Sequence, residues 1–336
     1  MLKKILCLTL SLTWASVAAA GVSQSGFKKL PNGHEINIEY TPAQPGKPTL
    51  VILNGLTYKL ESWNFMMPTL ESQGNGILRL DPMGQGQTLL KYAPIDFKIS
   101  IETQADDLAF LLKLLGIKQP VHLLGLSYGG GWAMVFANRY PAQVASLILM
   151  APFVGPLPGQ DMQIRSSIAV VRAQGYLNPL NALTDDELYD YFLKQNVYTT
   201  YPLYEPIVLE NPFKLEATFR LVQGIRKVEV QKYMKNFPDK AVHLIDAGLD
   251  QYIPRSMMDQ FWNDLPVSKK ASRMNLNFSE HKIPESKPVF AATWVNLILA
   301  GDSRISGGKT FEGYPNLGLA DSGSEKIDLP IDLWPF

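Results

Sequence analysis

Three residue types that nucleophilic hydrolysis requires occur in this chain in a meaningful order: a serine, an aspartate and a histidine. Ser127 lies in the pentapeptide Gly-Leu-Ser-Tyr-Gly at 125–129, directly after the apolar run at 121–124. A serine that ends a strand and begins a helix must adopt a strained backbone conformation, which lifts its hydroxyl clear of the sheet. Glycines two residues before and after it let the strand and the helix come that close. The pattern predicts a nucleophilic serine.

The serine needs a base, and the chain has four histidines. His281 alone lies in a polar loop, after a candidate strand at 273–278. His34 lies beside a predicted hairpin turn. His122 and His243 lie inside apolar runs, where a hydrogen-bonded core histidine is the expected reading. His281 is therefore the candidate general base.

An acid must orient that histidine. Asp250 follows the apolar run at 241–245 and lies in a predicted turn, so it is the candidate. Asp246 is the alternative acid, but it could instead cap the turn. The order Ser127, then the acid, then His281 is the chain order expected when the serine lies in a strand-to-helix turn.

The surrounding segments alternate between strand and helix patterns, which predicts an α/β fold with a doubly wound, mostly parallel sheet. A hairpin around Asn32-Gly33 precedes them. The predicted strands are 49–53, 77–80, 121–125 and 144–150, and the predicted helices are 63–73, 101–115 and 130–140.

These pieces resemble the α/β-hydrolase fold superfamily, in its capped serine esterase and lipase type. The resemblance covers roughly residues 26 to 300 and rests on several ordered motifs. They are Asn-Gly-Leu at 54–56, Asp-Pro-Met-Gly-Gln-Gly-Gln-Thr at 81–88, the serine pentapeptide, Gly-Leu-Asp at 248–250, and His281 with its following prolines.

The chain also departs from the family pattern. Asn54 stands where the family usually has histidine. Met83 and Gln85 stand where it often has arginine and histidine. None of these changes removes a catalytic group, but each blurs the assignment to a subfamily.

The resemblance implies a serine hydrolase that forms an acyl-enzyme. His281 would take the proton of Ser127, and Asp250 would stabilise the imidazolium. The oxyanion hole would consist of the backbone N–H groups of Leu56 and Tyr128. This chemistry requires no metal and no organic cofactor. The expected substrate is a small, apolar carboxylic ester.

Other activities remain open on the same residues. A peptidase, a thioesterase or a carbon–carbon bond hydrolase would use the same triad. A binding protein with an idle triad is the alternative of a different class, since a fold does not prove activity. The formal net charge is zero and no basic block occurs, so no nucleic-acid partner is expected.

The predicted organisation has five parts: a signal peptide at 1–20, the first part of a hydrolase core at 21–152, a helical lid at 153–239, the second part of the core at 240–300, and an extension at 301–336. Ten aromatic residues between 176 and 233 either shape an apolar pocket or form the lid's own small core. The extension shows no periodicity. Either it wraps the surface, pinned by Leu333, Trp334 and Phe336, or it is a disordered tail.

Two lysines, an apolar stretch and three alanines before Gly21 form the N-terminal segment. This is the pattern of a secretory signal peptide, which predicts an exported protein that is periplasmic or secreted. A membrane anchor is the alternative, but the stretch is shorter than a span requires. The single cysteine, Cys7, lies in this segment, so the mature chain would have no disulfide and no stable membrane anchor.

Overall fold

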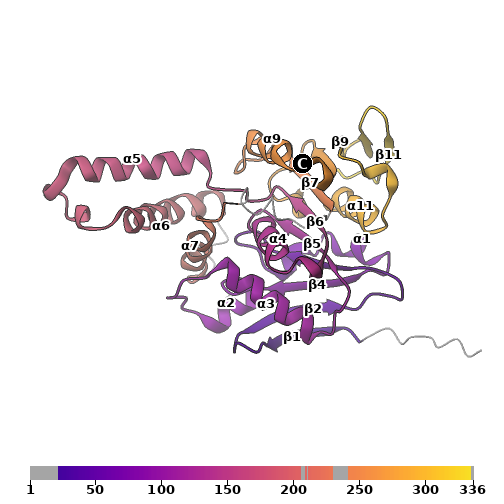
Figure 1. Cartoon of the computed structure of the whole chain (residues 1–336), viewed down its shortest axis with the longest axis horizontal. Coiled ribbons are helices and arrows are strands. Elements are labelled where there is room, and N and C mark those ends of the chain that lie inside the picture. Colours follow the sequence, from indigo (N-terminus) through magenta and orange to yellow (C-terminus); the bar gives the residue numbers. More distant parts are fainter. Residues whose placement is uncertain (1–21, 206–208, 210, 230–240, 334–336) are drawn as a thin grey trace, which may run out of the picture.

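The structure, a computed structural model, describes residues 22–205, 209, 211–229 and 241–333. The predicted signal peptide at 1–20 lies outside the described residues. Within them, eleven strands form one sheet in the order β1-β2-β4-β3-β5-β6-β7-β8-β9-β10-β11 (Figure 1). The strands are β1 Gln24–Lys29, β2 Glu35–Thr41, β3 Thr49–Leu53, β4 Gly76–Asp81, β5 Val121–Leu126, β6 Val144–Met150, β7 Ala241–Ala247, β8 Lys270–Leu276, β9 Lys309–Tyr314, β10 Leu319–Asp321 and β11 Lys326–Asp328.

The seven central strands, from β4 to β9 in the sheet order, are parallel, and antiparallel strands flank them at both edges. The predicted doubly wound, mostly parallel sheet is confirmed. The described α-helices are α1 Met67–Glu71, α2 Gly86–Tyr92, α3 Ile101–Leu114, α4 Tyr128–Arg139, α5 Pro158–Gln174, α6 Asp185–Tyr204, α7 Lys214–Ile225, α9 Arg255–Asp264, α10 Ile283–Ser286 and α11 Pro288–Leu299.

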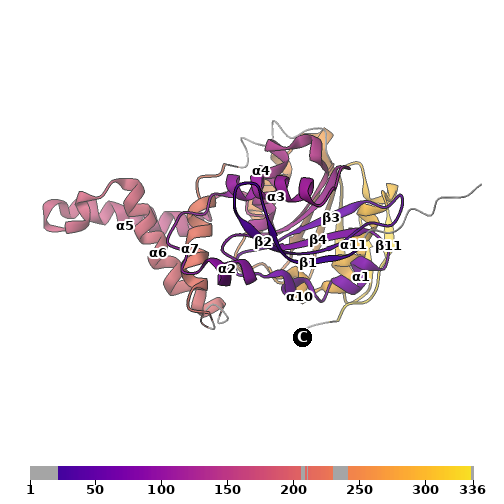
Figure 2. The same cartoon turned by 90° about the horizontal axis from the view of Figure 1, so that it is seen from below.

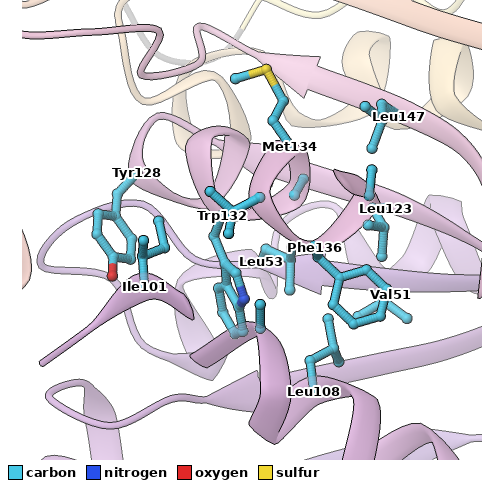
Figure 3. Close-up of a cluster of buried hydrophobic side chains, with 14 of the residues drawn as sticks. Val51, Leu53, Ile101, Leu108, Leu123, Tyr128, Trp132, Met134, Phe136 and Leu147 are labelled. Atoms are coloured by element: carbon cyan, nitrogen blue, oxygen red, sulfur yellow. The ribbon is translucent and has the colours of Figure 1, made fainter. Parts of the chain in front are cut away.

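The core lies on both faces of the sheet, because successive side chains of a strand point to opposite sides. In β3, Val51 and Leu53 pack into one cluster with α3 and α4. Leu50 and Ile52 of the same strand pack into the other cluster with α1 and α11. Figure 3 shows the first cluster, with Trp132 of α4 beside Leu53. A strand covered on both faces reads as a continuous apolar run, which is why β3 could be predicted.

Several local predictions are confirmed. The β1–β2 hairpin turns at Gly33, whose φ is +91°. Helix α3 begins after Ser100, whose hydroxyl accepts the N–H of Thr103. The helix predicted at 63–73 is shorter, because a short 3-10 turn precedes α1 and Pro68 occupies its first turn. Proline lacks the N–H that an earlier helical turn would need, so the regular helix starts beside it.

Helices α5, α6 and α7 lie between β6 and β7 in the chain. In both views α5 and α6 project away from the sheet (Figures 1 and 2). Helix α6 begins with the predicted capping box of Thr184 and Glu187. This helical insertion has a small core of its own around Phe219, with Tyr189, Phe192 and Tyr201 packed against it. Four aromatic side chains of the insertion thus serve its own packing, whereas Tyr176, Tyr191, Tyr198 and Phe213 are exposed. Tyr233 lies outside the described residues.

The C-terminal segment extends the sheet, which the sequence pattern did not indicate. Phe311 of β9 packs against Trp294 of α11 with ring centroids 5.1 Å apart. The carboxylate of Asp332 accepts the N–H groups of Val289 and Phe290 in the first turn of α11. The tail interpretation is therefore wrong for the described part of this segment. Leu333 is 51% exposed, and Trp334 and Phe336 lie outside the described residues.

Candidate active site

Ser127 forms the junction between β5 and α4 with φ of 52° and ψ of −115°. This is the strained conformation that the pentapeptide predicts. The flanking glycines allow this conformation because they have no side chain, so neighbouring backbone segments can lie very close to them. A Cβ on Gly125 would lie 2.4 Å from the carbonyl oxygen of Gly129, and a Cβ on Gly129 would lie 2.1 Å from that of Leu53. No real side chain tolerates such contacts, so the elbow requires glycine at both positions.

His281 and Asp250 come together from the two loops that follow β8 and β7. The Nδ1 atom of His281 lies 2.7 Å from Oδ2 of Asp250, and their side chains are 9% and 6% exposed. The other carboxylate oxygen of Asp250 accepts the backbone N–H groups of Tyr252 and Ile253, each at 2.8 Å. A carboxylate at Nδ1 favours the tautomer with its proton there, which leaves Nε2 as the basic nitrogen.

Asp246, the alternative acid, has a different partner. Its Oδ2 accepts a 2.6 Å hydrogen bond from Nε of Arg273, which also pairs with Asp259 at 2.6 Å. Both Asp246 and Arg273 are buried in the sheet region. This geometry makes Asp246 a member of a buried ion-pair group, so its contacts are structural.

Four of the predicted site residues line one cavity of about 330 Å³. They are Ser127, His281, Leu56 and Tyr128, and Asp250 lies behind His281. Volumes of this order suit a small organic ligand. The structure therefore brings together, at one place, residues from the junction of β5 and α4, the loop after β3, and the loops after β7 and β8.

The loop that carries Leu56 is braced by buried side chains. The amide of Asn54 donates to the carbonyl of Leu80 at 3.0 Å and accepts the indole N–H of Trp63 at 2.8 Å. Gln85 donates to the carbonyl of Gly55 at 2.7 Å. In the sequence alone, Gln85 is only a departure from the family pattern. Its contact shows that it supports the same loop from the neighbouring strand end.

Tyr128 contributes to the site through its backbone, because its side chain is committed elsewhere. The ring is buried beside Ile101 (Figure 3), and its hydroxyl donates to Oε1 of Gln104 at 2.7 Å. As the first residue of α4, Tyr128 has an N–H that no helical carbonyl can accept. That N–H belongs to the residue that directly follows Ser127.

The helical insertion supplies a wall of the cavity, and much of this wall is polar. Gln160 donates to Oδ1 of Asn196 at 2.6 Å, and Asn196 donates to Gln163 at 3.4 Å. Thr200 and Tyr201 also line the cavity. These residues cannot be recognised from the sequence, because polar positions on an amphipathic helix have the same pattern whether they meet water or a cavity.

Glu205 ends the same wall, and its role likewise cannot be recognised from the sequence. It is only 4% exposed, and its carboxylate binds Nζ of Lys282 at 2.6 Å and the hydroxyl of Tyr252 at 3.0 Å. The ring of Tyr252 packs edge-on against His281, with centroids 5.0 Å apart. A second buried polar group therefore adjoins the imidazole.

The two histidines within the strands, His122 and His243, each lie within hydrogen-bond distance of a serine hydroxyl, as their positions in apolar runs predict. Nδ1 of His122 lies 2.7 Å from the hydroxyl of Ser146, and Nδ1 of His243 lies 2.8 Å from that of Ser272. Burial lowers the pKa of His122 to about 4 and that of His243 to about 3. Both rings are neutral at ordinary pH.

In the described part of the chain, no group of three or more histidine, cysteine, aspartate or glutamate side chains could hold a metal ion. Across those same residues, no helix combines the length and apolar character that a membrane span needs.

A family model described as the alpha/beta hydrolase fold matches residues 48–200. Among curated proteins, a 2-hydroxy-6-oxononadienedioate/2-hydroxy-6-oxononatrienedioate hydrolase of Paraburkholderia phymatum is 30% identical over 148 residues, which is 40% of this chain and 49% of the relative. A (lyso)-N-acylphosphatidylethanolamine lipase of Homo sapiens is 30% identical over 170 residues, 47% of each chain. This chain thus spans about half the length of these relatives.

Solved structures with similar folds cover most of the chain. A putative lipase from Acinetobacter baumannii superposes with a TM-score of 0.59 at 19% identity, over 83% of this chain and 91% of that one. An esterase from Exiguobacterium antarcticum has a TM-score of 0.59 at 15% identity, over 82% and 100%. At these identities the likeness establishes the fold.

Proposed function

The chain belongs to the α/β-hydrolase fold superfamily, and we propose that it is a serine hydrolase that cleaves carboxylic esters. One observation carries the proposal. Ser127 lies in a strained elbow on the cavity that His281 also lines, and His281 is held from behind by Asp250 at 2.7 Å. A nucleophile, a base and an orienting acid are the groups that acyl transfer to water requires.

In the proposed mechanism, Nε2 of His281 takes the hydroxyl proton of Ser127 as the oxygen attacks the ester carbonyl. The backbone N–H groups of Leu56 and Tyr128 stabilise the tetrahedral oxyanion. His281 then gives the proton to the departing alcohol. Water, activated by the same imidazole, hydrolyses the acyl-enzyme. Asp250 stabilises the imidazolium in both steps.

Carbon–carbon bond hydrolysis is the second candidate. It is favoured by the similarity to relatives named as 2-hydroxy-6-oxononadienedioate/2-hydroxy-6-oxononatrienedioate hydrolases. We place esters first because ester cleavage needs only the groups already assigned. The helical insertion would act as a lid, and its polar wall bears on which substrate the cavity accepts.

The test is hydrolysis of p-nitrophenyl esters from short to long acyl chains by the wild type and by Ser127→Ala. We expect kcat to fall by about 10⁴-fold or more in the variant, as for other serine hydrolases. Ser166→Ala is the control, because Ser166 is exposed on α5. An organophosphonate should label the wild type and the control but not Ser127→Ala. Full turnover by Ser127→Ala would contradict the proposal.

We also propose that the protein is exported to the periplasm or secreted, with cleavage after Ala20. The lysines, apolar stretch and alanines of the N-terminal segment support this. N-terminal sequencing of the protein from the extracytoplasmic fraction should begin at Gly21. A cytoplasmic protein that retains Met1 would overturn the idea.

A further inference from the structure

Glu205 is a buried carboxylate in the cavity wall that the proposed mechanism does not use. It ends helix α6 of the insertion and is 4% exposed. It lines the same cavity as Ser127 and His281. Burial of a carboxylate costs free energy unless partners compensate, so a buried acid beside a reactive group needs an explanation.

Its partners come from the two loops that carry the acid and the base. Lys282 directly follows His281, and its Nζ lies 2.6 Å from Oε2 of Glu205. Tyr252 lies two residues after Asp250, and its hydroxyl donates to Oε1 at 3.0 Å. Each carboxylate oxygen has two acceptor sites, and each of these contacts uses one. Acceptor capacity therefore remains for a ligand.

One member of this group, Tyr252, packs against the imidazole, and the leaving group must also lie against the imidazole. His281 hands its proton to the departing alcohol, so that alcohol has to lie against the imidazole. The ring of Tyr252 contacts the imidazole at 5.0 Å between centroids, and Lys282 is its neighbour in the chain. Burial and the Glu205 carboxylate raise the pKa of the nearby Tyr201, which keeps its hydroxyl protonated.

An alkyl leaving group would displace water from these charged and hydroxyl groups and replace none of the lost hydrogen bonds. A leaving group with a hydroxyl of its own could donate to Glu205 or accept from Lys282. Sites built to hydrogen-bond a substrate group reject the analogue that lacks it far more strongly than apolar pockets distinguish methylene groups. The polar group should therefore affect specificity.

We propose that Glu205, Lys282 and Tyr252 form a subsite for the alcohol portion of the ester, which selects leaving groups that carry a further hydroxyl over plain alkyl alcohols. This rests on the proposed esterase function. The reaction itself is unchanged: water adds to the acyl carbon, and the alcohol leaves with the proton from His281.

The test compares 2-hydroxyethyl butanoate with propyl butanoate, which share the acyl group and differ by a hydroxyl in place of a methyl. For the wild type we expect kcat/KM to favour the hydroxyethyl ester by at least about tenfold. Glu205→Gln should lower that ratio about tenfold. Glu205→Gln/Lys282→Gln leaves no lone charge, and it should lose the preference even if the single variant folds poorly.

Glu216→Gln is the matched control. Glu216 also pairs a carboxylate with a lysine in the insertion, at 2.7 Å from Lys194, and it does not line the cavity. In this variant, the ratio of kcat/KM for the hydroxyethyl ester to that for the propyl ester should equal the wild-type ratio.

Two results would overturn the subsite while leaving the esterase in place. One is a wild type that hydrolyses both esters without preference. The other is an equal loss of kcat/KM on both esters in the Glu205 variants, together with a lowered melting temperature. In that case the ion pair would only stabilise the packing of the insertion against the core. If no ester is cleaved and no phosphonate labels Ser127, the proposed function fails, and the subsite fails with it.

Discussion

Asp250 and Asp246 lie four residues apart, and their contacts separate their roles. Asp250 places one oxygen on two backbone N–H groups and the other on His281. Asp246 is bound to Arg273 in the buried part of the sheet. A carboxylate that orients an imidazole acts on the reaction rate, whereas a carboxylate that compensates a buried guanidinium acts on stability.

Asp250→Asn should therefore reduce kcat by about 10³- to 10⁴-fold with little change in the free energy of unfolding, because the amide favours the wrong imidazole tautomer. Asp246→Asn should do the reverse. It should lower the free energy of unfolding by about 3 kcal/mol, since Arg273 loses a buried partner, with kcat within a few fold of wild type. Ester kinetics and urea unfolding of both variants check this. The opposite order of kcat losses would make Asp246 the acid.

At the scale of elements, the junction of β5 and α4 is the part of the site that its local sequence dictates most fully. The residues two before and two after Ser127 must be glycine, because the backbones of β3, β5 and α4 are in close contact there. The neighbouring loop after β3 is less constrained by its own sequence. It depends on Gln85 and Trp63, which come from other segments.

Gly129→Ala should destabilise the protein by more than about 3 kcal/mol, because its Cβ would lie 2.1 Å from the carbonyl oxygen of Leu53 and the backbone must shift. Gly159→Ala in α5 is the control, since a Cβ there meets nothing within 4 Å. Its stability should be unchanged or slightly higher, as alanine favours a helix. Thermal unfolding of both variants measures the difference. Equal melting temperatures would mean that the elbow tolerates a side chain.

At the scale of the whole molecule, two neutral histidines in the sheet link stability to pH. Burial lowers the pKa of His122 and His243 to about 4 and about 3, whereas an unfolded histidine titrates near 6.5. Between these values the unfolded chain binds protons that the folded chain does not. Stability is therefore full above pH 6.5 and is lost as the pH falls through that value.

The free energy of unfolding should drop by about 1 kcal/mol for each of these histidines between pH 7.5 and 5.5. Urea unfolding at both pH values measures it. Burial raises the pKa of the Asp246 carboxyl to about 6, so this group opposes the histidine contribution in the same window, and the histidine part is the difference between the wild type and a histidine variant. His122→Asn with His243→Asn keeps a polar atom near each serine hydroxyl and removes the titrating ring. The double variant should lose most of this pH dependence. If the free energy of unfolding of the double variant changes with pH as much as that of the wild type, then groups other than these two histidines cause the change.

The features that could be predicted from the sequence are those that depend on neighbouring residues. Strands β3, β5 and β6 are continuous apolar runs because both faces of the sheet are covered, and the elbow is marked by glycine spacing around Ser127. His281 could be selected because His122 and His243 lie inside such runs.

The features that depend on distant residues become visible only in the folded chain. Strands β10 and β11 have three residues each, too few to show a period, and they form because β10 pairs with β9 and β11 pairs with β10. Glu205 and Lys282 are 77 residues apart, yet they form a buried pair beside His281. The physical reason is that a polar residue has the same local pattern in water and in a cavity wall, so its role is set by what packs against it.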